Sequence, residues 1–513
     1  MERIHIICAA FFIVFTHIAF YFINKLWLRP KRLENFLRKH GFQGNPYRSI
    51  HGDLSEITRL TRSALSKPIS SLSHDIIPRI MPFVNETIQQ YGLKSFIWYG
   101  RRPRVNITKP EHIREIFTKY EVYHKECPTG SGTFGLVMRE GQNWVKIRRI
   151  LNPAFHVEKL KNMVPTMQLS CETMLKKWEE MVAEKGSSEI DVWSSLSSMS
   201  ADVIARAAFG TSYEEGKRLF KLQDQHVIIT FQVLRSVTNY IPGWRYIPTK
   251  MNRKKIKVER EIREIVKNLI CKRKESLKKG KYEHKDDLLG IMLESNEKEI
   301  EEHGSGMTMD DIIEECKLFH LAGEDTTAAL LTWTMLLLSQ YQDWQTKARE
   351  EVFKHFGKDK SPDFESINHL KIVAMIINET LRFYPPVTSL SRMIHQNTKL
   401  DKLPLLKGKE FSLPTILVHR DPDLWGSDAN EFNPGRFAQG VSNAAKVPGS
   451  FFPFGGGPRV CIGQNFALVE AKLVLAKILQ RFSFQLSPSY VHAPRCLVSL
   501  EPQFGTPLIL NKI

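Results

Sequence analysis

The sequence predicts a mainly α-helical protein with a small β part, arranged as one large domain behind a single N-terminal membrane helix. An apolar run opens the chain, apolar residues recur at three-to-four spacing through most of the remainder, and no repeat or long Gly/Ser-rich linker divides it. With 513 residues, 42% hydrophobic and 25% charged, the composition is globular and excludes disordered, collagenous and low-complexity classes.

The apolar run from Ile4 to Ile23 is the predicted membrane segment, because about 20 residues match the hydrocarbon thickness of a bilayer. A cleaved signal peptide is the alternative, but the run lacks a basic leader and a small-x-small exit. Basic residues follow it, so the positive-inside rule places the bulk of the chain in the cytosol. The expected organisation is an anchor over residues 1–24, a basic, proline-containing linker over 25–50 and a soluble domain over 51–513.

The body is expected to be helical over the longest periodic segments and extended over a few short ones. The predicted helices are Leu160–Val182, Ala201–Phe209, Leu219–Leu234, Ile256–Leu277, Met309–Gln340, Asp343–Phe356, Leu370–Phe383 and Gln464–Phe482. The predicted strands are Ser95–Tyr99, Arg104–Ile107, Thr415–Val418 and short segments near the C-terminus.

Charge and cysteine content limit the possible partners. The net charge of +18 permits nucleic acid, an anionic membrane or an acidic protein. The most basic stretch, Lys250–Lys281, has apolar residues on one helical face and no interleaved aromatics, which favours a solvated helix over a nucleic-acid patch. The apolar loop Ile241–Pro248 either dips into the bilayer or packs inside. The 7 Cys are scattered without a CxxC pair, so any functional Cys is expected to act alone.

Residues 454–463, with the sequence FGGGPRVCIG, form a Gly/Pro-rich loop that runs directly into an apolar-periodic helix. Cys461 stands at the helix start, where the dipole and free N–H groups are expected to lower the thiol pKa and favour metal ligation. The glycines would let the backbone approach a flat cofactor. Arg459 could pair with an anionic cofactor edge, and Phe454 could shield the sulfur. The alternative for a lone Cys is an inert buried thiol.

This loop resembles the haem-binding signature F-x-x-G-x-R-x-C-x-G of cytochromes P450 at all of its fixed positions. Those positions are Phe454, Gly457, Arg459, Cys461 and Gly463. The resemblance implies the cytochrome P450 fold and a haem b cofactor whose iron takes the Cys461 thiolate as axial ligand.

Two further segments resemble motifs of the same family. Glu379 and Arg382 form an E-x-x-R pair, which alone is an ordinary helix-surface pattern. Residues 432–437 are similar to the family's F-x-P-x-R-F segment, with Gly435 where an acidic residue is common. The resemblance implies that Glu379, Arg382 and Arg436 form a buried ionic triad around the Cys loop.

The long predicted helix carries AGEDTT at residues 322–327, which resembles the family motif [AG]-G-x-[DE]-T-[TS]. Without the resemblance, ordinary packing with Thr326 bonded to a carbonyl one turn earlier would be the simplest account. The resemblance implies that Ala322 and Gly323 lie against the macrocycle. It also makes Asp325 and Thr326 the catalytic acid and hydroxyl that supply protons to the reacting oxygen.

The remaining cofactor contacts are basic or aromatic. Trp144 and Arg148 fit a W-x-x-x-R pattern that holds a haem propionate in this family, a task suited to a bidentate guanidinium. Arg392 is a further propionate candidate. The suggested walls of the substrate pocket, for which core packing is an equal alternative, are Phe319, Ala322, Val387, Leu390 and Val498.

Longer stretches resemble the plant P450 clan seventy-two, and within it the subfamily of secologanin synthase and several triterpenoid and gibberellin oxidases. They are residues 152–161, 208–216, 314–319 and 487–494; the segment after Cys127 lacks familiar landmarks. The resemblance implies a single-pass endoplasmic-reticulum protein with a cytosolic catalytic domain. Such a monooxygenase uses dioxygen and NADPH electrons, delivered by a separate cytochrome P450 reductase, to oxidise a small lipophilic terpenoid. Reductase-independent rearrangement of peroxides by a haem-thiolate, and a non-catalytic membrane-tethered haem protein, remain the alternatives.

Overall fold

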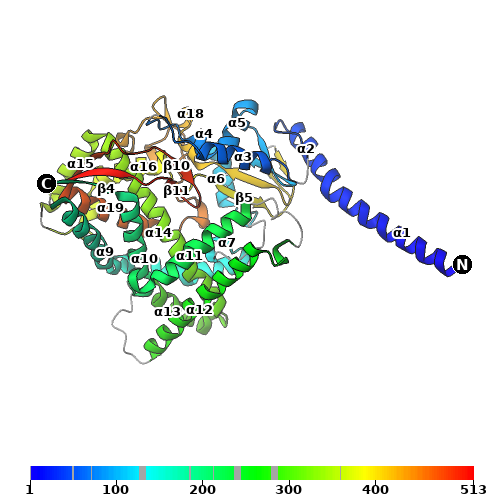
Figure 1. Ribbon diagram of the computed structural model, residues 1–513, viewed down its shortest axis with the longest axis horizontal. Coiled ribbons are helices and arrows are strands. Elements are labelled where there is room, and N and C mark those ends of the chain that lie inside the picture. Colours follow the sequence, from blue (N-terminus) through cyan, green and yellow to red (C-terminus); the bar gives the residue numbers. More distant parts are fainter. Residues whose placement is uncertain are drawn as a thin grey trace.

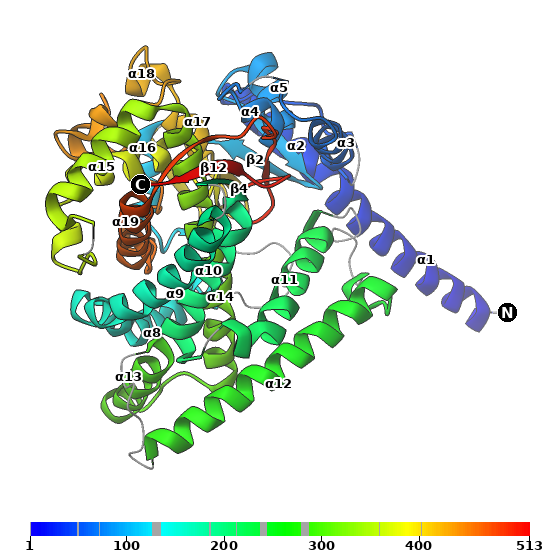
Figure 2. The same ribbon diagram turned by 60° about the vertical axis from the view of Figure 1, so that its left-hand side comes forward.

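The computed structural model describes residues 2–48, 51–70, 72–125, 135–183, 186–211, 213–235, 244–278, 287–358, 360–401 and 403–513. A helical body carries small sheets on one side, and α1 projects away from it (Figures 1 and 2). The segment that directly follows Cys127 and residues 241–243 of the apolar loop lie outside the described residues. In the rest of that loop Tyr246 is 75% exposed, so its side chain is not packed inside.

The N-terminal segment is one helix that passes from α1 (Glu2–Ile23) through a π-helical turn (Asn24–Leu28) into α2 (Arg29–Lys39). Among the described residues, one helix, Ile4–Lys39, is long and apolar enough to cross a membrane. The stretch expected to be a linker is therefore largely helical. Its end also packs against the body, because Tyr47 is buried beside Trp98 and its hydroxyl donates to Leu26 O over 2.8 Å.

The larger sheet has the strand order β1-β2-β8-β5-β3, in which β2 and β8 are parallel. Its strands are β1 (Phe96–Tyr99), β2 (Arg102–Asn106), β3 (Tyr123–His124), β5 (Leu390–Ile394) and β8 (Glu410–Leu413). The predicted strand at Thr415–Val418 is wrong. These residues form the short helix α17 (Thr415–His419), because Pro414 ends β8 and the β-branched side chains of Ile416 and Val418 are buried by tertiary packing.

The other strands form smaller sheets, in which β4 from the first half of the chain pairs with the C-terminal strand β12. A second sheet has the order β4-β12-β9, and two hairpins complete the β part. Their bounds are β4 (Ser187–Asp191), β9 (Phe482–Leu486), β12 (Pro507–Lys512), β10 (Pro494–Cys496), β11 (Leu500–Pro502), β6 (Thr398–Leu400) and β7 (Leu403–Leu405).

The central helix is α14 (Met309–Gln340), whose bounds agree with the prediction. It begins with the expected capping box, in which Thr308 and Asp311 satisfy each other's backbone N–H groups. Its second half, from Thr327 to Ser339, is buried on every face. α10 (Val192–Phe209), α16 (Lys371–Phe383) and α19 (Gln464–Arg481) pack against it and form the main core.

The remaining helices surround this core, and every predicted helix is confirmed. They are α3 (Leu54–Leu65), α4 (Ile77–Ile80), α5 (Pro82–Tyr91), α6 (Pro110–Thr118), α7 (Gly135–Met138), α8 (Gly141–Leu151), α9 (Val157–Ala183), α11 (Tyr213–Arg235), α12 (Lys250–Lys278), α13 (Leu288–His303), α15 (Gln342–Phe356) and α18 (Pro422–Trp425). The basic helix α12 buries Ile262, Val266 and Ile270, as its periodicity predicts.

Candidate active site

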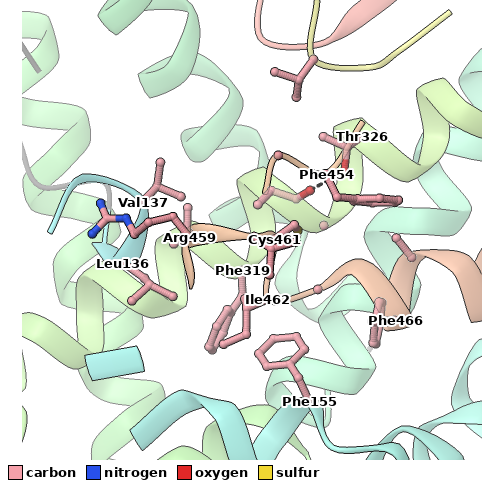
Figure 3. A pocket seen from close by; sticks show the side chains of 18 of the residues that line it. Leu136, Val137, Phe155, Phe319, Thr326, Phe454, Arg459, Cys461, Ile462 and Phe466 are labelled. Atoms are coloured by element: carbon pink, nitrogen blue, oxygen red, sulfur yellow. Dashed lines mark hydrogen bonds between the residues drawn. The ribbon is translucent and has the colours of Figure 1, made fainter. Parts of the chain in front are cut away.

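Cys461 lies between the Gly-rich loop and α19, with its side chain facing a cavity of about 300 Å³ inside the body (Figure 3). Its backbone N–H donates to Phe454 O over 3.0 Å, which closes the loop. Phe454 and Gly463 line the same cavity, and Thr326 of α14 lies on its wall. The structure therefore brings the Cys loop and the central helix together around one space, as predicted.

The glycines of this loop serve different purposes. Gly457 has φ +63°, and a Cβ there would lie 2.3 Å from the carbonyl oxygen of Phe117 in α6. Gly457 does not line the cavity, and its close contact with α6 accounts for a glycine at this position. Its approach to a cofactor stays a prediction. Gly463 does line the cavity.

The expected lowering of the thiol pKa is also wrong for the free side chain. Burial raises the pKa of Cys461, and this outweighs the hydrogen bond from the Gly463 N–H and the charges of Lys125 and Arg148. Loss of solvation thus dominates over the helix start.

The cavity has a cationic rim, formed by Lys125, Arg148, Arg392 and Arg459. Within the described residues, one acidic side chain forms an ion pair with this rim, Glu140, which lies 2.7 Å from Arg459. Arg459 Nη1 is buried without a hydrogen-bond partner in the described structure. Within the described residues the rim therefore has more cations than anionic partners, and carboxylates of a bound cofactor would supply the missing ones.

The clustered positive charges, together with burial, lower the pKa values of two rim residues. Burial, followed by the charges of Arg392 and Arg459, lowers the pKa of Lys125 to about 7. Burial and the charge of Arg459 lower the pKa of Arg392 to about 10. Lys125 was not predicted, because it follows β3 without any motif and only the fold brings it to the cavity.

The two predicted residues of α8 both line the cavity. Arg148 donates to Val460 O over 3.0 Å and so also fixes the Cys loop. Trp144 is buried, and the Arg459 guanidinium lies over its ring at 4.6 Å from the centroid. The indole thus orients the neighbouring arginine.

The wall contributed by α14 contains Ala322, Gly323 and Thr326. Thr326 Oγ1 donates to Ala322 O over 2.6 Å, which is the local bond that ordinary helix packing predicts. A Cβ at Gly323 would lie 2.6 Å from Ile204 of α10, so helix packing requires this glycine in addition to its place at the cavity.

Asp325 does not line the cavity, although Thr326 does. Burial and the charges of Glu501 and Asp224 raise the pKa of its carboxyl to about 7. The predicted acid therefore lies behind the cavity wall, and the predicted hydroxyl on it.

The predicted ionic triad comes together behind the Cys loop. Glu379 and Arg382 have 0% side-chain exposure and form two hydrogen bonds of 2.6 Å. Arg436 Nε lies 3.5 Å from Glu379 Oε1. Asp428, which was not predicted, pairs with Arg436 over 2.8 Å and provides the carboxylate that Gly435 lacks.

Of the suggested pocket walls, all but one line the cavity. Phe319, Ala322, Val387 and Leu390 do so, but Val498 does not. Phe319 approaches Phe155, a wall residue that was not predicted, with ring centroids 6.2 Å apart. Away from the cationic rim the lining is therefore largely apolar.

Comparison with known proteins decides what this site is. Residues 78–502 match the cytochrome P450 family. The chain belongs to this family. A cytochrome P450, CYP72A219 of Panax ginseng, is 49% identical over 496 residues, covering 96% of this chain and 95% of the relative. The 7-deoxyloganic acid hydroxylase of Catharanthus roseus is 48% identical over 516 residues, 98% of each chain.

Secologanin synthase 2 of Catharanthus roseus is 46% identical over 521 residues, covering 99% of this chain and 97% of the relative. The resemblance to this P450 subfamily is thus confirmed, and the protein is a cytochrome P450 monooxygenase.

The residues of the cavity fit the haem of this family. Cys461 would hold the iron, and the cationic rim, with its unpartnered Arg459 nitrogen, would hold the propionates. When bound, a thiolate-ligated haem supplies the activation of dioxygen. The chain itself contributes the apolar walls that exclude water and the Thr326 hydroxyl.

Proposed function

We propose that this P450 hydroxylates or otherwise oxidises a small lipophilic plant terpenoid of the iridoid, triterpenoid or gibberellin type. Support comes from relatives named for 7-deoxyloganic acid and secologanin, which match over nearly the whole chain at 48% and 46% identity. Apolar side chains such as Phe319, Val387 and Leu390 suit a substrate of this kind.

We further propose that the protein is anchored in the endoplasmic reticulum membrane by its N-terminal helix, with the catalytic domain in the cytosol. The basic residues after Ile23 support this orientation. The soluble domain would begin near residue 51, although part of the preceding segment packs against it. A separate NADPH–cytochrome P450 reductase would deliver the electrons, and the net charge of +18 would favour docking of an acidic partner.

Thr326 and Asp325 are proposed to move protons during the reaction. Thr326 presents its hydroxyl at the cavity wall, next to the predicted acid on α14. This arrangement favours monooxygenation over the rearrangement of peroxides, which has little need of a proton relay. NADPH consumption in the presence of a reductase would separate such an enzyme from a non-catalytic haem carrier.

The first test is the carbon monoxide difference spectrum of the reduced microsomal protein, with Cys461→Ser beside the wild type. A red-shifted Soret band in the wild type alone is the expected result. The same microsomes, supplied with reductase and NADPH, are then given a terpenoid panel, and products that contain one added oxygen are sought by mass spectrometry.

Each opposing outcome points to a specific alternative. Turnover of peroxides without reductase would favour the rearrangement chemistry. A normal Soret band without NADPH-dependent products across the terpenoid classes would overturn the proposed substrate, and a missing band in folded wild type would overturn Cys461 ligation.

A further inference from the structure

Three side chains with metal-binding atoms meet between α11 and α14, outside the Cys461 cavity. Asp224 of α11 and His320 and Glu324 of α14 each offer one ligand atom, and these atoms lie within 4.8 Å of one another. None of the three lines the cavity. His320 and Glu324 are four residues apart on one helix, so their side chains project from the same face.

His320 is buried, with 2% of its side chain exposed, and its Nε2 points into this group. Nε2 lies 3.0 Å from Glu324 Oε2 and 4.0 Å from Asp224 Oδ1. Neither ring nitrogen has a hydrogen-bond partner in the described part of the chain. The ring of Phe220 stacks on the imidazole at 4.5 Å and 18°, which fixes its plane.

No basic side chain neutralises these carboxyl groups in the described part of the chain, since neither Asp224 nor Glu324 forms an ion pair with a Lys or Arg there. Glu324 is mostly buried beside the imidazole, with 17% of its side chain exposed, whereas Asp224 faces the solvent. The group therefore offers three donor atoms around one point, with one side open to an incoming ion.

We propose that Asp224, His320 and Glu324 bind a divalent transition metal of the zinc type and thereby tie α11 to α14. One imidazole nitrogen and two carboxylate oxygens form a mixed ligand set suited to Zn²⁺. With metal–ligand bonds of about 2.0–2.2 Å, tetrahedral ligand atoms lie about 3.3–3.6 Å apart. The two distances from Nε2 bracket this separation, so small side-chain rotations complete the site. The Asp224 side chain is 63% exposed, which gives the ion access from solvent and leaves a position for water.

Metal binding is expected to form a bridge between two helices. α11 holds a single ligand, whereas α14 holds two and is anchored in the core. The metal should therefore stabilise α11 on α14 without altering the Cys461 cavity, whose lining includes none of the three ligands.

The test uses the full-length, haem-loaded protein in detergent, dialysed against a buffer of micromolar free Zn²⁺. The zinc-to-haem ratio is then measured by elemental mass spectrometry. The wild type should hold one zinc more than each of three variants: His320→Gln, Glu324→Gln and Asp224→Asn. Loss of one ligand should weaken binding by at least about tenfold, since even outer-shell partners of a metal contribute this much.

His226→Gln is the matched control, because His226 of α11 is, like His320, a buried histidine but lies outside the group. It should retain the wild-type zinc content. The exposed Asp224→Asn variant decides the question if His320→Gln fails to fold, as judged by its carbon monoxide spectrum. Hydrogen exchange offers a second readout, and zinc should slow exchange in α11 of the wild type and of His226→Gln but not in the three ligand variants. Equal zinc content in the wild type and Asp224→Asn, with no change in α11 exchange, would overturn the proposal.

Discussion

The ionic triad and the cationic rim both bury charge, but only the triad, together with Asp428, balances it. Glu379 accepts hydrogen bonds from Arg382 and from the Asn433 N–H, and Arg382 also donates to carbonyl oxygens of the loops that follow. The rim instead gathers Lys125, Arg392 and Arg459 with few anionic partners. A balanced cluster of buried charges therefore indicates a scaffold, and a cluster of one sign indicates a place for a charged ligand.

The largest loss of stability is expected when the negative charge of the triad is removed. Glu379→Gln leaves the buried Arg382 charge uncompensated, which should cost about 3–5 kcal/mol of stability. We expect almost no haem-loaded protein from this variant, measured as the carbon monoxide Soret band per polypeptide. Asp428→Asn is the milder control, because Asp428 is 36% exposed and Arg436 retains the carbonyl oxygens of Trp425 and Asp428. Normal haem loading of Glu379→Gln would show that the triad is not a scaffold.

In contrast to the triad variant, removing charge from the rim should not lower the stability of the haem-free protein. Lys125→Met relieves repulsion from Arg392 and Arg459, so the apoprotein should resist urea at least as well as the wild type. The haem should dissociate about tenfold faster, measured by its transfer to apomyoglobin. Lys119→Met, which removes an exposed lysine paired with Glu115, should change neither quantity. A less stable apoprotein with unchanged haem dissociation would contradict the ligand role of the rim.

Thr326→Ala tests the cavity wall that α14 contributes, which holds a hydroxyl and no cation. We expect the carbon monoxide band to persist and the yield of product per NADPH to fall by at least about tenfold, because a proton-handling hydroxyl is lost. Thr334→Ala removes an equivalent bond, from Thr334 Oγ1 to Leu330 O over 2.7 Å, away from the cavity. Equal yields from the two variants would reduce Thr326 to a helix-packing residue.

The last comparison concerns His419, whose backbone carbonyl accepts a hydrogen bond from Arg382 of the triad. Burial and the charge of Arg382 lower its pKa to about 3, whereas an unfolded histidine titrates near 6.5. The unfolded state therefore binds the proton more readily. The contribution to stability is full above pH 6.5 and is lost as pH falls toward 3, by up to about 1.4 kcal/mol per pH unit.

His419→Gln should flatten this dependence between pH 6.5 and 5, as measured by urea unfolding. Glutamine retains an acceptor for the Phe452 N–H, which His419 Nε2 accepts over 3.0 Å. An unchanged slope would show that other groups control acid sensitivity.

Short motifs with fixed spacing are the features that could be predicted from the sequence. Thr326 and the Glu379–Arg382 pair lie on helices, Cys461 lies just before one, and the capping box and apolar period define α14. Motif residues and helix bounds are local properties, and local properties can be predicted well from the sequence.

The remainder depended on tertiary contacts that leave no local pattern. Lys125 and Asp428 lie in loops, and only the fold brings them to their partners. The segment Thr415–Val418 has the composition of a strand but forms the short helix α17. Asp325 and Thr326 are neighbours in sequence, yet successive residues of a helix point about 100° apart, so one lies on the cavity and the other behind it. The pKa of the Cys461 thiol was mispredicted because burial depends on the whole fold.

The unbroken helix from α1 to α2 has a mechanical consequence. The Tyr47 hydroxyl donates to Leu26 O and its ring lies beside Trp98 of β1, so the base of this helix is fastened to the sheet. A tilt of the helix in a bilayer would therefore rotate the catalytic body with it. The residues from Glu2 to Tyr47 would thus set the angle between the proposed anchor and the body.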